Sequence, residues 1–162
     1  MISLSIGHGF DVHGFADERD LILGGVKIPH DRGLSGHSDA DVLVHAIMDA
    51  LLGAAGLPDI GQQFPPTDEA YKDADSCQLL GKVLQLIRDS GVKSINNIDA
   101  IIMAEQPTLN PYVPAMREKI AGVLEIEQSR ISIKATTTEG LGFVGRGDGI
   151  AASAICLVGK DG

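Results

Sequence analysis

The stretch GFDVH at residues 9–13 lies at the end of a loosely alternating segment, residues 2–10, whose pattern predicts the first strand of the fold. Asp11 and His13 are separated by one residue, and side chains in extended chain repeat every two positions, so both point to the same side of the strand end. An acid and an imidazole held in this way can bind the same ligand. The same pattern also occurs as two solvated side chains on a strand edge, and the pair alone does not decide between the two.

A second stretch, SDADVLVHAIMDALLGAA at residues 38–55, predicts a helix. It has almost no polar face, so we expect it to be buried nearly all round. Three polar side chains nevertheless share one stripe at positions i, i+4 and i+8, namely Asp41, His45 and Asp49. Because an unpaired buried charge is costly, this stripe must find partners.

Two interpretations of His45 follow from this stripe. One is an internal hydrogen-bonded network. In the other, His45 meets Asp11 and His13 around a divalent metal, and two imidazoles with one carboxylate give the ligand count of a catalytic zinc site with an open fourth position. Asp41 or Asp49, one turn away, would then hold the other ring nitrogen of His45.

Local signals near the two stretches add expectations about their ends. Ser38 or Asp39 is expected to be the N-cap of the helix. The glycines at positions 7, 9 and 14 would let the strand bend and let a ligand approach its backbone.

Composition limits the class of protein. The 162 residues fit one domain, and 44% hydrophobic residues are enough for a core. That core must be built from small side chains, because the chain has no Trp, 4% aromatic residues and 20 glycines. Elements must therefore approach closely or bury extra surface between subunits, which favours an oligomer.

Charge and cysteine content exclude several functions. A net charge of −9 argues against nucleic acid or an anionic membrane as the main partner. Cys77 and Cys156 are too few for a disulfide framework, so reduced thiols are expected. The first ten residues lack the features of a signal peptide, and no apolar run reaches the length of a membrane span. We expect a bacterial cytoplasmic protein.

The rest of the chain predicts one α/β domain with a mixed sheet and helices. Residues 98–105 are nearly continuously apolar and indicate a strand buried on both faces. Residues 56–68 are rich in Gly and Pro and indicate a long loop, either a lid or simply mobile. The remaining expected elements are a hairpin at 21–28, a loop at 29–37, helices at 75–90 and 113–124, a turn at 106–111 and strands at 130–136 and 149–158.

A second group of polar residues follows the strand at 130–136. Thr136, Thr137 and Thr138 offer hydroxyls and amides to phosphate, and Glu139 among phosphates would hold Mg²⁺. The alternative is a β-prone run that ends in a turn.

The glycine-rich segment 140–149 could likewise be only a flexible hairpin. Phe143 and Arg146 within it favour a binding role. A diphosphate suits this group, with Lys134 or Arg146 as its cation. No Ser-His-Asp order, Cys nucleophile or Walker A loop is present, so hydrolysis by metal-bound water and intramolecular transfer both stay open.

Taken together, these pieces resemble the 2-C-methyl-D-erythritol 2,4-cyclodiphosphate synthases of the non-mevalonate isoprenoid pathway. The resemblance rests on ordered motifs along the chain: GHGFDVH, LILGGVKIP, GLSGHSDADVLVHAIMDALLGAAGLPDIGQQFP, YKDADS and IKATTTEGLGFVGRGDGIA. It implies that residues 1–162 form a single synthase domain. It also implies a homotrimer whose sheets face the three-fold axis and whose active sites lie between subunits.

The resemblance also implies site residues. Asp11, His13 and His45 would bind zinc, one ion per subunit, and Glu139 would hold Mg²⁺ or Mn²⁺, one per active site. His37 and Thr137 would orient and stabilise the transferring phosphoryl group. The substrate would be held by Ser38, Asp59, Ile60, Gly61, Phe64, Thr67 and Asp68 at its erythritol end and by Ala104, Pro107, Thr108, Leu109, Asn110, Ala135 and Thr136 at its cytidine end.

The implied reaction cyclises 4-diphosphocytidyl-2-C-methyl-D-erythritol 2-phosphate and releases CMP. The alternative is a zinc-dependent phosphohydrolase of a nucleotide diphosphate, and a non-enzymatic trimeric scaffold is a third interpretation. In some relatives, an Arg and a nearby Phe line an axial cavity that holds an isoprenoid diphosphate, and Phe143 and Arg146 stand at these positions. The chain departs from the pattern of some relatives at Pro66, Thr108 and Asp148.

Overall fold

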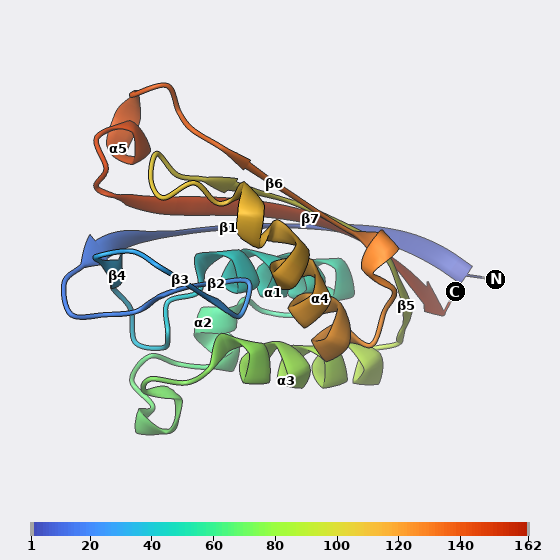
Figure 1. Ribbon diagram of the computed structural model, residues 1–162. Helices are drawn as coiled ribbons and strands as arrows, with labels where there is room; N and C mark the ends of the chain where they lie inside the picture. The colour runs from blue at the N-terminus through green and yellow to red at the C-terminus, as the bar shows by residue number, and fades with distance from the viewer. Residues whose placement is uncertain (1, 162) are drawn as a thin grey trace.

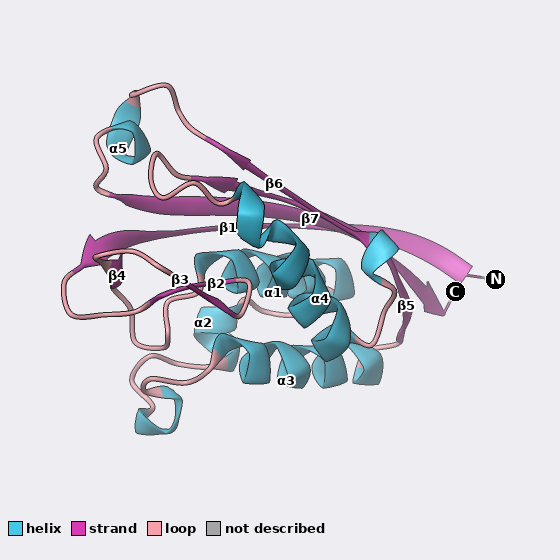
Figure 2. Cartoon of the chain, viewed as in Figure 1, coloured by secondary structure: helices cyan, strands magenta, loops and turns pink. Residues whose placement is uncertain are grey.

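The fold consists of one five-stranded mixed sheet with its helices packed against it (Figures 1 and 2). The computed structural model describes residues 2–161. The strand order is β4-β1-β7-β5-β6, and β2 and β3 form a separate hairpin. The elements are β1 (Ile2–Ala16), β2 (Leu21–Leu23), β3 (Val26–Ile28), β4 (Gly33–Leu34), α1 (Val42–Ala55), α2 (Ile60–Gln63), α3 (Ser76–Asp89), β5 (Val92–Met103), α4 (Val113–Leu124), β6 (Ile131–Thr136), α5 (Gly142–Gly145) and β7 (Gly149–Asp161), with short 3₁₀ helices at Glu69–Tyr71, Asn110–Tyr112 and Gln128–Arg130.

The sheet is centred on two long antiparallel strands, β1 and β7. They pair without interruption from Ile2 opposite Asp161 to Gly14 opposite Gly149. On the other side of β7, β5 is antiparallel to it and β6 is parallel to β5. The predicted mixed sheet packed by helices is therefore confirmed.

All three long helices lie on one face of the sheet. In Figure 1, α1 runs directly beneath β1 and β7, α3 lies below α1, and α4 stands beside them. The core fills the space between, and α1 is buried nearly all round, as its sequence predicted. On the opposite face, the large apolar side chains that remain exposed include Leu4, Ile6, Phe10, Val12 and Ile155.

Two glycines of β1 set the distance between this strand and α1. A Cβ atom on Gly7 would lie 1.7 Å from the carbonyl oxygen of Ala50, and one on Gly9 would lie 1.9 Å from that of Ala46. Neither contact is physically allowed, so the helix backbone rests directly on the strand only because both positions are glycine. These glycines therefore make room for a helix rather than for a ligand, which corrects the sequence-based expectation.

Three expected boundaries also need correction. The strand at residues 2–10 continues to Ala16, because β7 pairs with it along its length and β4 pairs with its last residues. β5 begins at Val92 rather than at residue 98 and alternates between buried and exposed positions, because helices cover only one of its faces. The expected loop at 56–68 contains the short helix α2.

Within residues 2–161, every helix falls short of the length and apolar character that crossing a bilayer requires.

Candidate functional site

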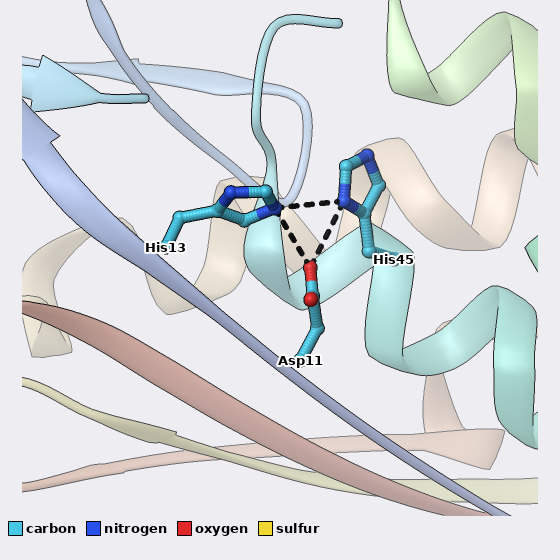
Figure 3. A group of neighbouring side chains, drawn as sticks. All are labelled: Asp11, His13 and His45. Carbon is cyan, nitrogen blue, oxygen red and sulfur yellow. Dashed lines mark hydrogen bonds and ion pairs between the residues drawn. The ribbon is translucent and has the colours of Figure 1, made fainter. Parts of the chain in front are cut away.

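The side chains of Asp11, His13 and His45 converge where α1 lies against β1 (Figure 3). Asp11 Oδ2 lies 2.9 Å from His13 Nε2 and 3.0 Å from His45 Nδ1. The two ring nitrogens are 3.3 Å apart. The strand contributes two members at alternate positions and the helix contributes the third, so residues distant in sequence form one cluster.

A positive charge must lie within this cluster. His13 Nδ1 is 2.7 Å from the carbonyl oxygen of Ser35, which only accepts, so Nδ1 carries a hydrogen and a neutral ring presents its Nε2 lone pair to Asp11. Burial alone would lower the pKa of His13, but the hydrogen bond and charge of Asp11 outweigh it and raise that pKa. Burial would likewise raise the pKa of Asp11, but its bonds to the two imidazoles hold it well below the ordinary value.

A divalent metal fits this cluster as well as a proton does. Ligand atoms around a tetrahedral zinc lie about 3.3 Å from one another. The separations of 2.9, 3.0 and 3.3 Å among the three atoms are close to that value. Two neutral imidazoles and one carboxylate are also a donor set that zinc accepts, with a fourth position left for another ligand.

Asp41, predicted as a partner of His45, has a different role. It is the N-cap of α1, and its carboxylate accepts hydrogen bonds from the backbone N–H groups of Gly24 at 2.9 Å, Gly25 at 2.7 Å and Val44 at 3.1 Å. Its complete burial raises its pKa to about 6 despite these bonds. The prediction failed because a cap looks the same in sequence as the first member of a polar stripe.

The other two expectations about this helix also need correction. Asp49, the alternative partner of His45, instead accepts a hydrogen bond of 2.9 Å from the backbone N–H of Ile60 and so anchors α2. Because Asp41 caps the helix, neither Ser38 nor Asp39 does. The second ring nitrogen of His45, Nε2, contacts two hydroxyl groups instead.

These hydroxyl groups belong to Ser76, with Oγ at 3.0 Å, and Ser38, with Oγ at 3.2 Å. Ser76 was missed because a serine at the start of a helix reads as an ordinary capping residue. Arg19 was missed as well. It donates to the carbonyl oxygens of Gly36 at 3.1 Å and Ser38 at 2.5 Å and so fixes the segment that carries His37.

A cavity of about 230 Å³ opens beside the cluster. Many of the residues predicted at the zinc and erythritol sites line it, and so does Pro66 of the predicted erythritol loop, together with three residues that were not predicted there, Met48, Tyr71 and Leu79. The predicted lining residues are Asp11, His13, His37, Ser38, His45, Ile60, Gly61 and Phe64.

Three predicted residues lie outside that lining. Asp59 caps α2 by accepting from Gln62 N at 3.0 Å, and Asp68 caps the following 3₁₀ helix. His37 Nε2 is 3.2 Å from the carbonyl oxygen of Asp68, so the loop contacts the cavity wall through its backbone. Thr67 is exposed in the same loop.

A separate cavity of about 140 Å³ gathers the residues predicted for cytidine. It is lined by Ala104, Glu105, Pro107, Thr108, Leu109, Asn110, Ala135, Thr136 and Thr137. This cavity and the one beside the cluster have no lining residue in common. Thr137 and His37, predicted to act on the same phosphoryl group, therefore line different cavities of the single chain.

Glu105 organises the turn after β6, which sequence reasoning also missed. Its carboxylate accepts from Thr138 N at 2.9 Å and Gly140 N at 3.3 Å, and the first of these bonds is the main reason that its pKa is lowered. Within the turn, Thr137 Oγ1 donates to Glu139 Oε1 at 3.4 Å. Glu139 itself adopts a positive φ of 54° and lines neither cavity.

The glycine-rich segment after this turn contains the short helix α5 instead of a hairpin. Phe143 is 38% exposed, and Arg146 is paired with Asp148 at 3.0 Å. Lys134, the other predicted cation, is paired with Asp99. None of these side chains lines the two cavities described above.

Comparisons with known proteins agree on one family. Residues 4–159 match the YgbB family. The 2-C-methyl-D-erythritol 2,4-cyclodiphosphate synthase of Moorella thermoacetica is 58% identical over 96% of this chain and 94% of its own length.

Solved structures are similar along the whole chain. A Plasmodium falciparum IspF structure described as a CDP complex is 33% identical, with a TM-score of 0.85, over 99% of this chain and 98% of that one. The bifunctional IspDF of Campylobacter jejuni is 43% identical with a TM-score of 0.95, and this chain covers 99% of itself but 43% of that longer protein. The chain belongs to the YgbB family, among the relatives named 2-C-methyl-D-erythritol 2,4-cyclodiphosphate synthase.

Proposed function

We propose that this protein converts 4-diphosphocytidyl-2-C-methyl-D-erythritol 2-phosphate to 2-C-methyl-D-erythritol 2,4-cyclodiphosphate and CMP. The observation that carries the proposal is the cluster of Asp11, His13 and His45 beside a cavity, in a chain that is 58% identical to a named synthase. No named relative reported above is a phosphohydrolase, so the hydrolytic alternative has no comparable support.

The cluster would hold zinc through His13 Nε2, His45 Nδ1 and Asp11 Oδ2, and Glu139 would hold a second ion, Mg²⁺ or Mn²⁺. Bound there, the metals supply positive charge that neutralises and orients phosphoryl oxygens. Glu139 is a suitable ligand for this second ion because a carboxylate beside phosphate oxygens suits a hard cation.

The reaction needs little covalent chemistry from the protein. An oxygen of the substrate's 2-phosphate attacks the β-phosphorus, and the bond from that phosphorus to the oxygen bridging it to the cytidine phosphate breaks, with its electron pair leaving on CMP. Because the nucleophile is already an anion, no general base is required. The chain's task is to bend the substrate, align the attack and disperse charge, which we assign to His37 and Thr137.

We assign the two cavities to the two ends of the substrate. The cavity of about 230 Å³ would take the methylerythritol 2-phosphate, with Ser38, Ile60 and Gly61 at its wall and Asp59, Thr67 and Asp68 shaping the loop behind it. The cavity of about 140 Å³ would take the cytidine. Pro66 and Thr108, which depart from the pattern of some relatives, lie on these walls.

The separate linings of the two cavities support active sites completed between subunits, as in the homotrimer that the resemblance implies. One substrate must reach both, so the cytidine cavity of one subunit would complete the metal cavity of its neighbour. The exposed apolar side chains of Leu4, Ile6, Phe10, Val12 and Ile155 would be buried around the three-fold axis. Phe143 and Arg146 stay exposed in the single chain, which leaves them available for an axial isoprenoid diphosphate.

We place the enzyme in the bacterial cytoplasm. Cys77 and Cys156 are both free and buried, which suits a reducing compartment.

Turnover of the synthetic substrate in ¹⁸O-labelled water tests the proposed reaction. Intramolecular attack incorporates no solvent oxygen, so both the cyclic product and CMP should contain only unlabelled oxygen. A hydrolase would place one labelled oxygen in a product phosphate, and that result would overturn the proposal.

A further inference from the structure

A hydrogen-bond chain leads away from the metal cluster on the far side of the His45 ring. His45 Nε2 contacts Ser76 Oγ at 3.0 Å, and this hydroxyl contacts Asp39 Oδ1. The other carboxylate oxygen, Asp39 Oδ2, accepts from the backbone N–H of Ser76 at 2.9 Å. Ser76 is 0% exposed and His45 is 6% exposed, so the bond between them is shielded from water, whereas Asp39 is half-buried.

The chemistry of the three groups fixes the direction of the chain. A serine hydroxyl has one hydrogen to donate, and an ionised carboxylate only accepts. The Ser76 hydrogen must therefore point to Asp39, which leaves the Ser76 oxygen as an acceptor toward His45. The hydrogen of that second bond has to come from His45 Nε2.

This direction determines which nitrogen of a neutral His45 ring carries the lone pair. With the hydrogen on Nε2, the lone pair is on Nδ1, the atom that lies 3.0 Å from Asp11 Oδ2 and 3.3 Å from His13 Nε2. The Ser35 carbonyl sets the ring of His13 in the same way. Both imidazoles, when neutral, thus direct a lone pair into the cluster.

Ser38 does not provide an equivalent partner. Its hydroxyl lies farther from His45 Nε2, at 3.2 Å, and accepts a backbone hydrogen bond from Ala40 N at 3.2 Å. Within residues 2–161, the contacts of that hydroxyl include no carboxylate that would dictate where its own hydrogen points. Among the described residues, the path from Nε2 of the ring to a carboxylate runs through Ser76.

We propose that Ser76 and Asp39 are positioning residues that hold His45 in its metal-binding tautomer and increase its strength as a ligand. The inference deepens the proposed metal site and rests on it. A carboxylate behind a histidine ligand fixes the ring and makes it more basic, and losing such a partner lowers metal affinity 10–100-fold. Here the serine hydroxyl transmits the effect of the carboxylate.

The tautomer can be measured in the unaltered protein without metal. The experiment is a ¹⁵N NMR spectrum of histidine-labelled protein, treated with chelator, at pH 8, above the ordinary histidine pKa of about 6.5. A hydrogen on Nε2 of His45 is the expected result. A bare Nε2 would overturn the inference whether or not the protein binds zinc, so this outcome is separate from any failure of the proposed function.

Variants test the effect on affinity, measured by competition between the protein and a chelator for Zn²⁺. Ser76→Ala should lower the affinity by about 10-fold or more, and Asp39→Asn should lower it by less because an amide oxygen can still accept. Asp75→Ala is the matched control, since Asp75 caps the same helix through Cys77 N at 2.8 Å without touching His45.

The control separates positioning from stability. Asp75→Ala should destabilise α3 and leave zinc affinity unchanged. If Ser76→Ala leaves the affinity unchanged, or if Asp75→Ala lowers it equally, the role of Ser76 is merely structural and the inference is wrong. Failure of the unaltered protein to bind zinc would instead contradict the proposed function.

Discussion

The two faces of the sheet differ although they share the same strands. On β1, Gly9 and Asp11 face α1, whereas Phe10 and Val12 point to the uncovered side. The covered face brings a helix backbone into contact with the strand and assembles the metal cluster. The uncovered face carries large apolar side chains. One strand thus supplies metal ligands on one face and, in our proposal, a subunit interface on the other, because successive side chains point to opposite faces.

The largest effect is expected from removing chemistry on the covered face. His45→Ala deletes the helix's contribution to the cluster, so turnover should fall by more than about 10³-fold, beyond the loss from one transition-state hydrogen bond. Steady-state CMP release measures this change, and circular dichroism should show the fold retained. Activity within tenfold of the unaltered protein would contradict a role for the cluster.

The next effect concerns the contact between α1 and β1. Gly9→Val would place atoms against the carbonyl oxygen of Ala46, so the free energy of unfolding should fall by about 3 kcal/mol. Urea denaturation measures it, and zinc affinity should fall as well because His45 moves away from Asp11. Gly53→Ala, at a helix position with nothing within 4 Å, is the control and should stabilise the protein by up to about 1 kcal/mol.

The uncovered face can be changed independently. Ile6 is 72% exposed in the single chain, and Ile6→Glu would bury a charge without a partner if three subunits close over it. Sedimentation should then report one chain per particle instead of three, with helix content unchanged. Gln78→Glu, an equivalent added charge on α3, should leave the particle size unaltered. A trimer that persists in Ile6→Glu would move the proposed interface elsewhere.

The smallest effect is electrostatic and lies at the start of α1. The pKa of Asp41 is raised by burial to about 6, above its unfolded value near 3.8, so the folded chain holds this proton more tightly. Its contribution to stability is therefore greatest below pH 4 and is lost as pH rises through 6. In the unaltered protein, the urea midpoint should therefore fall as pH rises from about 4 through 6, and in Asp41→Asn this fall should be absent. If the urea midpoint of the unaltered protein and that of Asp41→Asn change with pH in the same way, Asp41 does not titrate in this range.

Some contacts of the site could be predicted from the sequence and others could not. The convergence of His45 with Asp11 and His13 could be predicted, because alternation on a strand and an ordered set of motifs both carry that information. The roles of Ser76 and Arg19 could not be predicted. Each depends on which loop or helix end folds beside it, and no local pattern encodes that contact.

The errors have the same cause. Residues 11–16 belong to β1 because β7 and β4 pair with them, not because of their own pattern. The Asp41 carboxylate accepts hydrogen bonds from backbone N–H groups of the turn between β2 and β3 and also caps α1. This combination arises only when the hairpin and the helix meet. Tertiary contacts decided both cases.

In the proposed site, three side chains hold one zinc at the junction of β1 and α1. Crystals of zinc-loaded protein, measured at the zinc absorption edge, test it most directly. We expect one anomalous peak per subunit, about 2.0–2.2 Å from His13 Nε2, His45 Nδ1 and Asp11 Oδ2. A cluster without a peak, or zinc bound through His45 Nε2, would contradict it.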